Sequence, residues 1–545
     1  MEEQIEVKEL DNVVVHFSGD SGDGMQLAGN IFTTVSATVG NGVSTFPDYP
    51  ADIRAPQGSL TGVSGFQVHI GAGKVYTPGD RCDVLVAMNA AALKMQYKHC
   101  KPNGTIIIDT DSFGPRDLQK AEFRSDDYLG EMGIDPDCVV ACPITKMVKE
   151  CLADTGMDNK SMLKCRNMFA LGIVCWLFNR DLTLVNSFLE KKFKKKPAIA
   201  EANIRVVEAG YNYGHNVHAS VPNTYRIESK VKEPGRYMDI TGNKATAYGL
   251  MAAAERAGLR LFLGSYPITP ATDILHELAK HKSMGVTTVQ CEDEIAGCAS
   301  AIGAAFAGAL AATSTSGPGI CLKSEAMNLA IIDELPLVII DVQRGGPSTG
   351  MPTKSEQTDL MQALYGRNGE APLPVVAATT PDTCFLYAYW AAKLALEHMT
   401  PVILLTDSFI ANGSSAWRIP EADSPPDIKP QYVDQLPEGT ENWRPYLRNE
   451  ETHVRYWAVP GTPGFEHRLG GLEKNYKTSA ISTDAANHAL MVATRQAKID
   501  YIANSIPLLE VEGDQDAEVL VVGWGGTYGH LYEATHKVRE RGYKI

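Results

Sequence analysis

Between residues 264 and 360 the chain repeatedly interrupts an apolar segment with a turn of small and polar residues. Four such turns occur, at residues 265–270, 292–294, 315–319 and 344–350. In a parallel sheet, the turns that follow the carboxyl ends of the strands converge on one crevice. The spacing therefore predicts an α/β domain with a binding site at one edge of its sheet.

Strand-like and helix-like segments alternate along the rest of the chain as well. Because 545 residues exceed what one hydrophobic core usually holds, the pattern predicts a multidomain α/β protein, with a parallel sheet in its first domain. A Gly-rich turn after the first strand leads into a predicted helix over 25–39. The clearest expected strands are 13–17, 83–88, 104–108, 337–342 and 401–405.

We divide the chain into four segments. The first α/β domain covers 1–217, and a second α/β domain covers 218–412. Residues 413–516 are predicted to be a linker and connecting segment, since prolines interrupt regular structure there up to about residue 466. Residues 517–545 begin another domain, with a strand at 518–522 and a helix through 539. A complete βαβ unit takes about 30 residues or more, so this last domain is expected to be incomplete.

Composition excludes several classes of protein. A net charge of -15 and a pI near 5.4 argue against a nucleic-acid-binding surface, which needs clustered Lys and Arg. No apolar run approaches the roughly 20 residues that cross a bilayer, and the acidic N-terminus does not resemble a targeting signal, so a cytoplasmic protein is expected. The 11 cysteines include no CxxC pair, which argues against an iron-sulfur cluster or zinc site held wholly by this chain.

Glu294 opens a segment of unusually small residues that is predicted to be a helix over 294–310. Small residues let the backbone approach a neighbouring helix or a flat ring closely. A carboxylate in such apolar surroundings has a raised pKa and can share a proton. The alternative is that Glu294 only occupies the first turn of the helix, where the helix dipole favours a carboxylate.

Four motifs, in this order, resemble the α subunits of 2-oxoacid:ferredoxin oxidoreductases: YPITP at 266–270, EDE at 292–294, TSTSGPG at 313–319 and RGGPSTGMPTKSEQTDL at 344–360. Two earlier motifs, GDSGDGMQLAGN at 19–30 and FPDYPADIRAPQG at 46–58, resemble the γ subunit of that family, fused in front. The resemblance implies a γ-type α/β domain, then a thiamine-diphosphate pyrimidine-binding α/β domain, then a partial transketolase C-terminal-like α/β domain.

The resemblance also implies an activity. The family uses thiamine diphosphate to convert a 2-oxoacid and CoA to an acyl-CoA and CO2, and it reduces ferredoxin; the expected reaction here is 2-oxoglutarate to succinyl-CoA, or the reverse carboxylation. Glu294 matches the catalytic glutamate that bonds N1′ of the aminopyrimidine. Thr269 matches a threonine that reaches the substrate by hydrogen bonding, although it could instead be a helix N-cap before Pro270.

A second carboxylate on the substrate requires a buried cation. Arg344 is the candidate, supported by Thr353 and Lys354, because a guanidinium binds a carboxylate through two hydrogen bonds. The alternative is a surface arginine on a mobile loop. The residues expected to contact the thiamine cofactor are Tyr266, Pro267, Ile268, Glu294, Ser316 and Gly317.

The sequence Gly22-Asp23-Gly24 resembles a magnesium-binding GDG, but no Asn pair follows it. We therefore interpret it as a Gly-rich turn in which the amides of Gly22 and Gly24 could hold a CoA phosphate. Arg54 could contact the same group or form a structural ion pair. Mg2+ and a [4Fe-4S] cluster are then expected in a separate β subunit that shares the active site. The expected assembly is a dimer of αβ heterodimers that reduces ferredoxin.

Three alternatives stay open. The same family also acts on pyruvate, branched-chain and indolepyruvate-type 2-oxoacids. A nicotinamide-dependent dehydrogenase would need a clean GxGxxG followed by an acidic ribose ligand, which the N-terminal turn lacks. A noncatalytic CoA-binding or assembly subunit is the third possibility.

Overall fold

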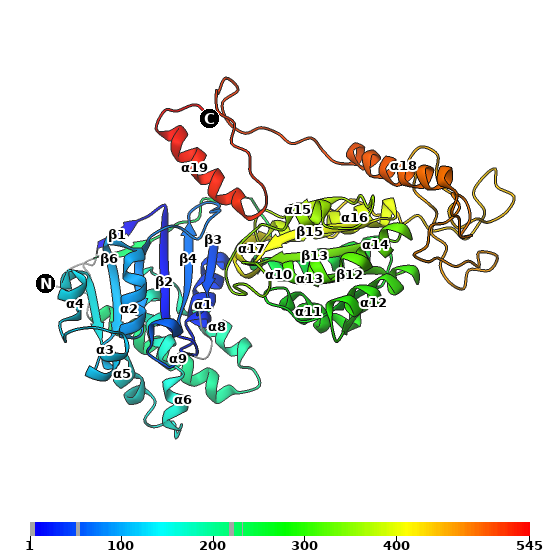
Figure 1. The fold of residues 1–545 in the computed structure, drawn as a ribbon. Helices are drawn as coiled ribbons and strands as arrows, with labels where there is room; N and C mark the ends of the chain where they lie inside the picture. The colour runs from blue at the N-terminus through cyan, green and yellow to red at the C-terminus, as the bar shows by residue number, and fades with distance from the viewer. Residues whose placement is uncertain (1–5, 51–54, 217–222, 232) are drawn as a thin grey trace. The chain divides into compact units, whose positions relative to one another are not determined.

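The chain forms two compact units, which we describe separately (Figure 1). The computed structural model describes residues 6–50, 55–216, 223–231 and 233–545. Unit 1 comprises Met1–Asp239 and Gly413–Ile419, and unit 2 comprises Ile240–Asn412 and Pro420–Ile545. Within the described residues, every helix is too short or too polar to cross a membrane.

Unit 1 is built on an eight-stranded sheet in the order β7-β6-β5-β2-β4-β3-β16-β9. β2 pairs parallel with β5 but antiparallel with β4, and β3 is antiparallel to β4. The sheet is therefore mixed, and the prediction of a parallel sheet in this domain is wrong for its β4–β3 side. The strands are β2 (Asn12–Asp20), β3 (Gly42–Asp48), β4 (Val63–Gly71), β5 (Cys82–Ala87), β6 (Cys100–Asp109), β7 (Val139–Cys142), β9 (Tyr237–Thr241) and β16 (Ser414–Arg418), with a separate parallel pair of β1 (Glu6–Glu9) and β8 (Asn223–Arg226).

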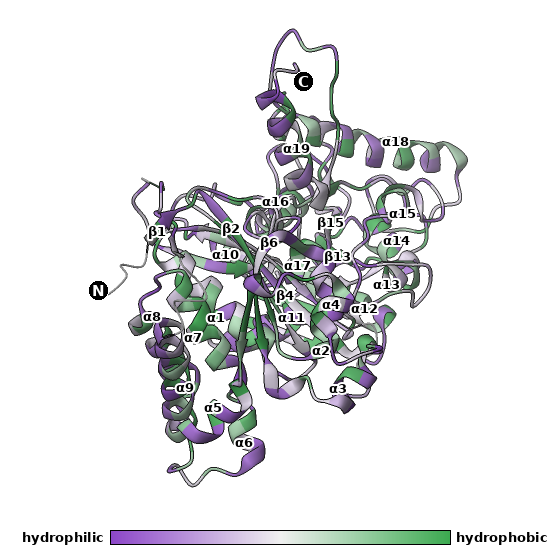
Figure 2. Ribbon diagram, turned by 90° about the vertical axis from the view of Figure 1, so that its left-hand side faces the viewer, coloured by the Kyte–Doolittle hydropathy of each residue, from purple (hydrophilic) through white to green (hydrophobic). Residues whose placement is uncertain are grey.

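Helices cover both faces of this sheet, and the strands are therefore buried on both sides. On β2, Val13 and Val15 enter a core shared with α1 and α7, whereas Val14 enters a second core shared with α2. In Figure 2 hydrophobic colouring follows these strands, while hydrophilic residues are frequent on α9. The helices are α1 (Met25–Thr38), α2 (Ala90–Gln96), α3 (Pro115–Lys120), α4 (Tyr128–Met132), α5 (Ile144–Cys151), α6 (Asn159–Leu163), α7 (Arg166–Leu177), α8 (Leu182–Lys192) and α9 (Pro197–Asn216).

Unit 2 contains a six-stranded sheet in the order β11-β10-β12-β13-β15-β14, and its strand pairs are parallel. On β13, Leu337 and Ile339 enter one core and Val338 and Ile340 the other. Burial on both faces explains the continuous apolar runs that mark these strands in the sequence. The strands are β10 (Leu261–Ser265), β11 (Val286–Gln290), β12 (Leu310–Thr315), β13 (Leu337–Gln343), β14 (Val375–Ala377) and β15 (Pro401–Asp407).

The helices of unit 2 pack on both faces of that sheet. The predicted small-residue helix is shorter than expected: it ends at Phe306, because Gly308 takes a left-handed φ of 93° and β12 starts at Leu310. The helices are α10 (Gly242–Ala257), α11 (Thr272–Leu278), α12 (Glu294–Phe306), α13 (Gly317–Leu322), α14 (Ser324–Ile332), α15 (Leu360–Tyr365), α16 (Thr383–His398), α17 (Ser408–Asn412), α18 (Ala485–Ile502) and α19 (Tyr528–Glu540).

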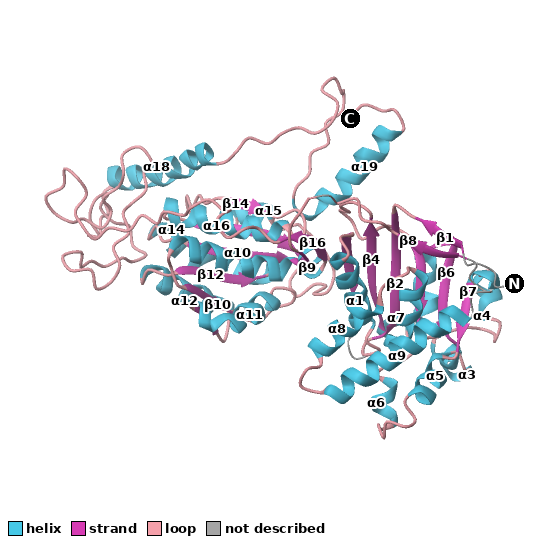
Figure 3. Ribbon diagram, turned by 180° about the vertical axis from the view of Figure 1, so that it is seen from behind, coloured by secondary structure: helices cyan, strands magenta, loops and turns pink. Residues whose placement is uncertain are grey.

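The stretch between β16 and α18 runs mostly as loop (Figure 3), and buried ion pairs and hydrogen bonds attach part of it to the rest of unit 2. Glu334, which is fully buried, forms ion pairs with Arg448 of this stretch and, at 2.8 Å, with Lys498 of α18. Arg455 donates from Nε to the Glu334 carbonyl at 3.0 Å. Burial raises the pKa of Glu334, but the charges of Arg448 and Lys498 outweigh it and lower that pKa to about 2. The predicted division into four segments stays a prediction, because the two compact units are a coarser division.

The strand predicted at 518–522 is wrong. These residues form no strand, and Leu520 and Val522 are 67% and 82% exposed. A strand needs a hydrogen-bonding neighbour, and in the described chain none pairs with this segment. The helix predicted to run through 539 is α19. Just before it, the chain passes so close to the end of β15 that a Cβ added to Gly526 would lie 2.3 Å from Asp407 Oδ2.

Candidate active site

Each of the four predicted turns follows the carboxyl end of one strand of the unit 2 sheet. The strands that carry them are β11, β10, β12 and β13, which are consecutive neighbours in the sheet. The turns therefore lie side by side at one edge, as the sequence predicted. This edge is the candidate active site.

Arg344 links two of these turns. Its Nη1 donates to the Thr269 carbonyl at 2.8 Å and its Nη2 to the Thr349 carbonyl at 3.1 Å. The residue is 8% exposed, so the interpretation as a surface arginine is wrong. Its Nε is buried and has no hydrogen-bond partner. The guanidinium therefore holds the site together and keeps donor capacity for a ligand.

Thr269 is exposed and does not cap a helix. The helix that follows, α11, begins at Thr272 and has Ala271 at its N-cap, so the N-cap interpretation of Thr269 is wrong. The same turn carries Tyr266, which is 38% exposed, with Pro267 and Ile268 half-buried beside it. Thr269 is therefore an accessible residue of the turn whose carbonyl Arg344 holds.

The loop after Arg344 folds back on itself. Met351 N donates to the Gly345 carbonyl at 2.8 Å, and Gly345 N donates to the Lys354 carbonyl at 3.0 Å. The predicted substrate-binding residues Thr353 and Lys354, both half-buried, are thereby held next to Arg344 in space as well as in sequence.

Glu294 is the first residue of α12, and it is 8% exposed. The preceding Asp293 caps the helix by accepting from Ala296 N at 2.7 Å. Burial lowers the pKa of Arg344, and the negative charge of Glu294 opposes that effect. Glu294 therefore occupies the first turn of a helix, as one interpretation expected, and its charge acts on Arg344; its role as a proton-sharing catalytic residue stays a prediction.

Glycines hold α12 and α13 unusually close to their neighbours. A Cβ added to Gly264 of β10 would lie 2.5 Å from the carbonyl oxygen of Gly297 in α12 and 2.2 Å from Ser300 Oγ. A Cβ on Gly319 would lie 1.9 Å from Thr315 Oγ1 and 3.0 Å from Glu294 Cγ. No larger residue fits at these positions without movement, so the small-residue pattern fixes where Glu294 stands.

Several buried polar atoms at this edge lack a hydrogen-bond partner. Besides Arg344 Nε, the clearest is Ser316 Oγ; the buried carboxyl groups of Asp341 and Asp359 also lack an ordinary donor, but they lie against each other and share a hydrogen bond. Ser316 and Gly317 lie at the start of α13, and a Cβ on Gly317 would be 2.7 Å from Asp359 Oδ2. Because buried polar atoms are nearly always hydrogen-bonded in native proteins, this set fits a bound polar group.

Three charged residues of this edge were not predicted from the sequence. Lys323 is fully buried and donates to Thr313 Oγ1 at 2.6 Å. Burial raises the pKa of Asp341 well above its usual range, and the charge of Asp359 adds to that effect. The available signal was a charged residue inside an apolar segment, as in the β13 sequence LVIIDVQ.

The Gly-rich turn of unit 1 is filled by its own side chains. Gly22 and Gly24 have φ of 120° and 79°. Asp23 accepts from Asp20 N at 3.0 Å and forms an ion pair with Arg166 at 2.8 Å. Arg54, the other residue predicted to contact CoA, lies outside the described residues. Among the residues that are described, no group of three or more His, Cys, Asp or Glu side chains could hold a metal ion.

Two family models match most of the chain. Residues 14–213 match the model described as "Pyruvate ferredoxin/flavodoxin oxidoreductase", and residues 252–487 match the model described as "Pyruvate flavodoxin/ferredoxin oxidoreductase, thiamine diP-bdg". The second match contains all four turns of the candidate active site. The partnerless polar atoms described above thus lie within a domain whose family description names thiamine diphosphate.

Relatives match over nearly the whole chain. The 2-oxoglutarate oxidoreductase subunit KorA of Mycobacterium tuberculosis is 50% identical over 538 residues, which is 98% of this chain and 81% of that protein. The 2-oxoacid:ferredoxin oxidoreductase 1 subunit alpha of Aeropyrum pernix is 27% identical over 97% of this chain and 85% of its own length.

A solved structure agrees with these relatives. The 2-oxoglutarate:ferredoxin oxidoreductase of Magnetococcus marinus superposes with a TM-score of 0.83 at 30% identity, covering 98% of this chain and 87% of that one. Its structure contains 2-oxoglutarate, coenzyme A and succinyl-CoA. These similarities, together with the arrangement of the four turns, show that the chain belongs to the 2-oxoacid:ferredoxin oxidoreductase family.

Proposed function

We propose that this chain is the α subunit, with a γ-type domain fused in front, of an enzyme that converts 2-oxoglutarate and CoA to succinyl-CoA and CO2 with reduction of ferredoxin, or catalyses the reverse carboxylation. The observation that carries the proposal is the buried Glu294 at the edge where Arg344 joins two turns. The 50% identity to a 2-oxoglutarate oxidoreductase subunit supports 2-oxoglutarate over other 2-oxoacids.

Thiamine diphosphate, when bound, supplies a carbon nucleophile and an electron sink for decarboxylation. In this proposal Glu294 holds a proton at its carboxyl oxygen against N1′ of the aminopyrimidine. Tyr266, Pro267 and Ile268 form one wall for the ring, and Ser316 Oγ is a free hydrogen-bonding group on the neighbouring turn, after β12. The closely packed glycines at 264, 297 and 319 keep Glu294 in position.

Arg344 provides the positive charge for the distal carboxylate of the substrate. Two of its N–H groups hold backbone carbonyls, which leaves Nε–H and the remaining Nη hydrogens for the ligand. The exposed Thr269 and the half-buried Thr353 and Lys354 complete the proposed substrate contacts. A carboxylate that loses water on binding needs this charge because an unpaired buried charge is costly.

We further propose that a β subunit completes the site. It would hold the diphosphate through Mg2+ and carry a [4Fe-4S] cluster that passes electrons to ferredoxin, in a dimer of αβ heterodimers. The absence of any CxxC pair from the sequence supports this division. CoA contacts at Gly22, Gly24 and Arg54 stay a prediction, and the carboxylate of Asp23 in that turn gives them no support.

The catalytic proposal is tested in the complex purified with its β subunit. We expect Glu294→Gln to lower kcat for ferredoxin reduction by a factor of about 100 or more, the usual size of a general acid-base contribution. Glu292→Gln is the matched control, since Glu292 is exposed two residues earlier in the same turn. Retention of more than half of the wild-type kcat by Glu294→Gln would overturn the assignment.

The substrate proposal is tested with Arg344→Met. We expect kcat/KM for 2-oxoglutarate to fall by a factor of about 100, as for loss of a charge-assisted contact, with a much smaller fall for pyruvate. An equal loss on both acids would show that Arg344 only holds the two turns. A wild-type enzyme that prefers pyruvate or a branched-chain acid would refute 2-oxoglutarate as the substrate.

A further inference from the structure

Unit 2 contains a cavity of about 290 Å3 at the opposite edge of its sheet from the active-site turns. It is lined by α14, by α18 and by the loops at 368–371 and 471–473. α14 leads into the start of β13, and the loop at 368–371 precedes the start of β14. In a parallel sheet the starts of the strands share one edge, and the candidate active site occupies the other.

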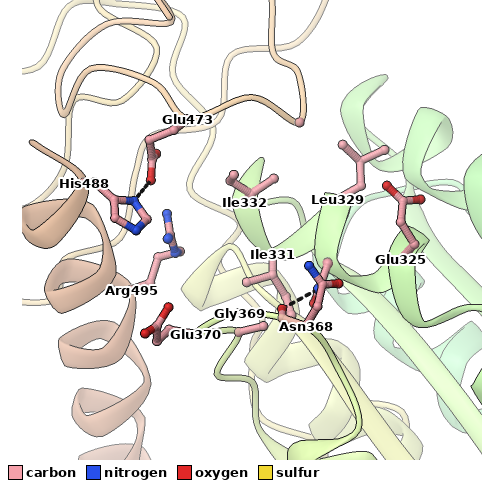
Figure 4. A pocket seen from close by; sticks show the side chains of 13 residues that line it. Glu325, Leu329, Ile331, Ile332, Asn368, Gly369, Glu370, Glu473, His488 and Arg495 are labelled. Carbon is pink, nitrogen blue, oxygen red and sulfur yellow. Dashed lines mark hydrogen bonds and ion pairs between the residues drawn. The ribbon is translucent and has the colours of Figure 1, made fainter. Parts of the chain in front are cut away.

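Arg495 of α18 is the buried charged group of this cavity, and it lacks a partner among the described residues. It is 6% exposed, and its Nε and Nη1 are buried without a hydrogen bond. Among the described residues no carboxylate lies within ion-pair distance of its guanidinium, although Glu370 lines the same cavity and is drawn near Arg495 in Figure 4. A buried charge without a partner costs several kcal/mol, so the arrangement points to an acidic group on a ligand.

The remaining charges of the cavity are negative. Glu325 and Glu370 are exposed lining residues, and Glu473 accepts from or shares a proton with His488 Nδ1 at 2.6 Å. A simple anion would be attracted by Arg495 and repelled by these carboxylates. A ligand with one negative and one positive group satisfies both sides.

The wall between these charges is apolar. Leu329, Ile331 and Ile332 of α14 line it, as Figure 4 shows. A volume of about 290 Å3 is at the small end of ligand pockets and equals the space of roughly ten waters, which suits a molecule of amino-acid size.

We propose that this cavity binds a free α-amino acid with an aliphatic side chain. The carboxylate pairs with Arg495, the ammonium group with Glu370, and the side chain packs against Leu329 and Ile332. The site is separate from the proposed reaction, and binding there requires neither 2-oxoglutarate nor thiamine diphosphate.

The test is calorimetric titration of the purified complex with L-leucine and three analogues. Leucinamide lacks the carboxylate, 4-methylpentanoate lacks the ammonium group, and inorganic phosphate is an anion alone. We expect saturable binding of L-leucine and at least tenfold weaker binding of each analogue. Arg495→Gln and Glu370→Gln should each weaken leucine binding at least tenfold, while Gln496→Ala, on the exposed side of α18, should leave it unchanged.

Four results would overturn the proposal. Equal binding of 4-methylpentanoate or phosphate would identify a plain anion site. Leucine binding unaffected by Glu370→Gln, an exposed position whose change leaves the core intact, would place the ligand elsewhere. Unaffected binding in folded Arg495→Gln would do the same. Failure of all four probes to bind, with Arg495 paired to a partner-subunit carboxylate in a structure of the complex, would make this a protein interface.

Discussion

The molecule contains two Gly-rich turns that look alike in sequence and differ in what surrounds them. In unit 1, the carboxylate of Asp23 fills the turn at Gly22–Gly24: it accepts from the Asp20 backbone and pairs with Arg166, although Asp20 Oδ1 and Arg166 Nε beside it have no hydrogen-bond partner. In unit 2, the turn at Ser316–Gly319 carries no charged side chain, and the buried Ser316 Oγ has no hydrogen-bond partner in the described protein. We expect the paired carboxylate of the first turn to contribute stability, and the free hydroxyl of the second to be available for a ligand.

Paired and unpaired buried charges also occur together in unit 2. Glu334 is surrounded by Arg448, Lys498 and Arg455, and both of its carboxyl oxygens are paired. Arg495, on the same helix as Lys498, has no partner among the described residues. We therefore expect substitutions of charges that are paired within the protein to lower its stability. Substitutions of unpaired buried groups should instead lower ligand binding or turnover.

The largest effect is expected from Glu334→Gln. Removing one partner of a buried ion network leaves Arg448 and Lys498 uncompensated and should cost about 3 to 5 kcal/mol of unfolding free energy, measured by urea denaturation. Because the folded-state pKa of Glu334, about 2, lies below the ordinary value of 4.5, its contribution is complete above pH 4.5 and is lost as the pH falls toward 2. The variant should therefore lose less stability than the wild type between pH 5 and pH 3. An equal acid response would show that Glu334 is not the titrating group.

Gly319→Ala tests the unfilled turn. The new methyl group would meet Thr315 Oγ1 and Glu294 Cγ, and a displacement of about 1 Å at a reacting group costs a factor of roughly 100 in kcat. We expect that loss in a protein that keeps its circular dichroism spectrum, with a melting temperature lowered by the crowding around the new methyl group. Gly303→Ala in α12, where an added Cβ meets no neighbour within 4 Å, is the control and should stay fully active. Normal kcat in Gly319→Ala would mean that Glu294 tolerates displacement and that the close packing is incidental.

The smallest effect is expected from Asp23→Asn in the filled turn. Its ion pair with Arg166 is partly exposed, so we expect a loss of about 1 to 2 kcal/mol in stability and less than a twofold change in kcat. The KM for CoA decides whether the contrast between the turns is sound. If that KM changes more than twofold, the turn contacts CoA after all, and its internal partners do not exclude a ligand.

The sequence predicted the strands and the active-site edge of unit 2 well, because a parallel sheet buried on both faces leaves apolar runs and places the turns in order. It failed where long-range pairing decides the structure. The antiparallel β4 and β3 look like any other apolar strands, and the 518–522 run has strand composition but no partner.

The site was predicted only in part, for the same reason. The family-like motifs singled out Thr269, Arg344 and Glu294 as candidates, but the bond from Arg344 to the Thr269 carbonyl joins residues 75 positions apart. Lys323 and Asp341 were missed because a single charge in an apolar run is not interpretable until its neighbours are known. Arg495 was missed because its only distinction is the lack of a partner, which no sequence pattern records.

The close contact between β10 and α12 at Gly264 and Gly297 limits which amino acids the sequence can carry at these positions. Since the Gly264 and Gly297 backbones nearly touch, a library of random substitutions should return only glycine at 264 and almost only glycine at 297, while Gly303, six residues further along the same helix, should accept many replacements. Such a map of tolerated residues would trace the contact between strand and helix without any structure determination.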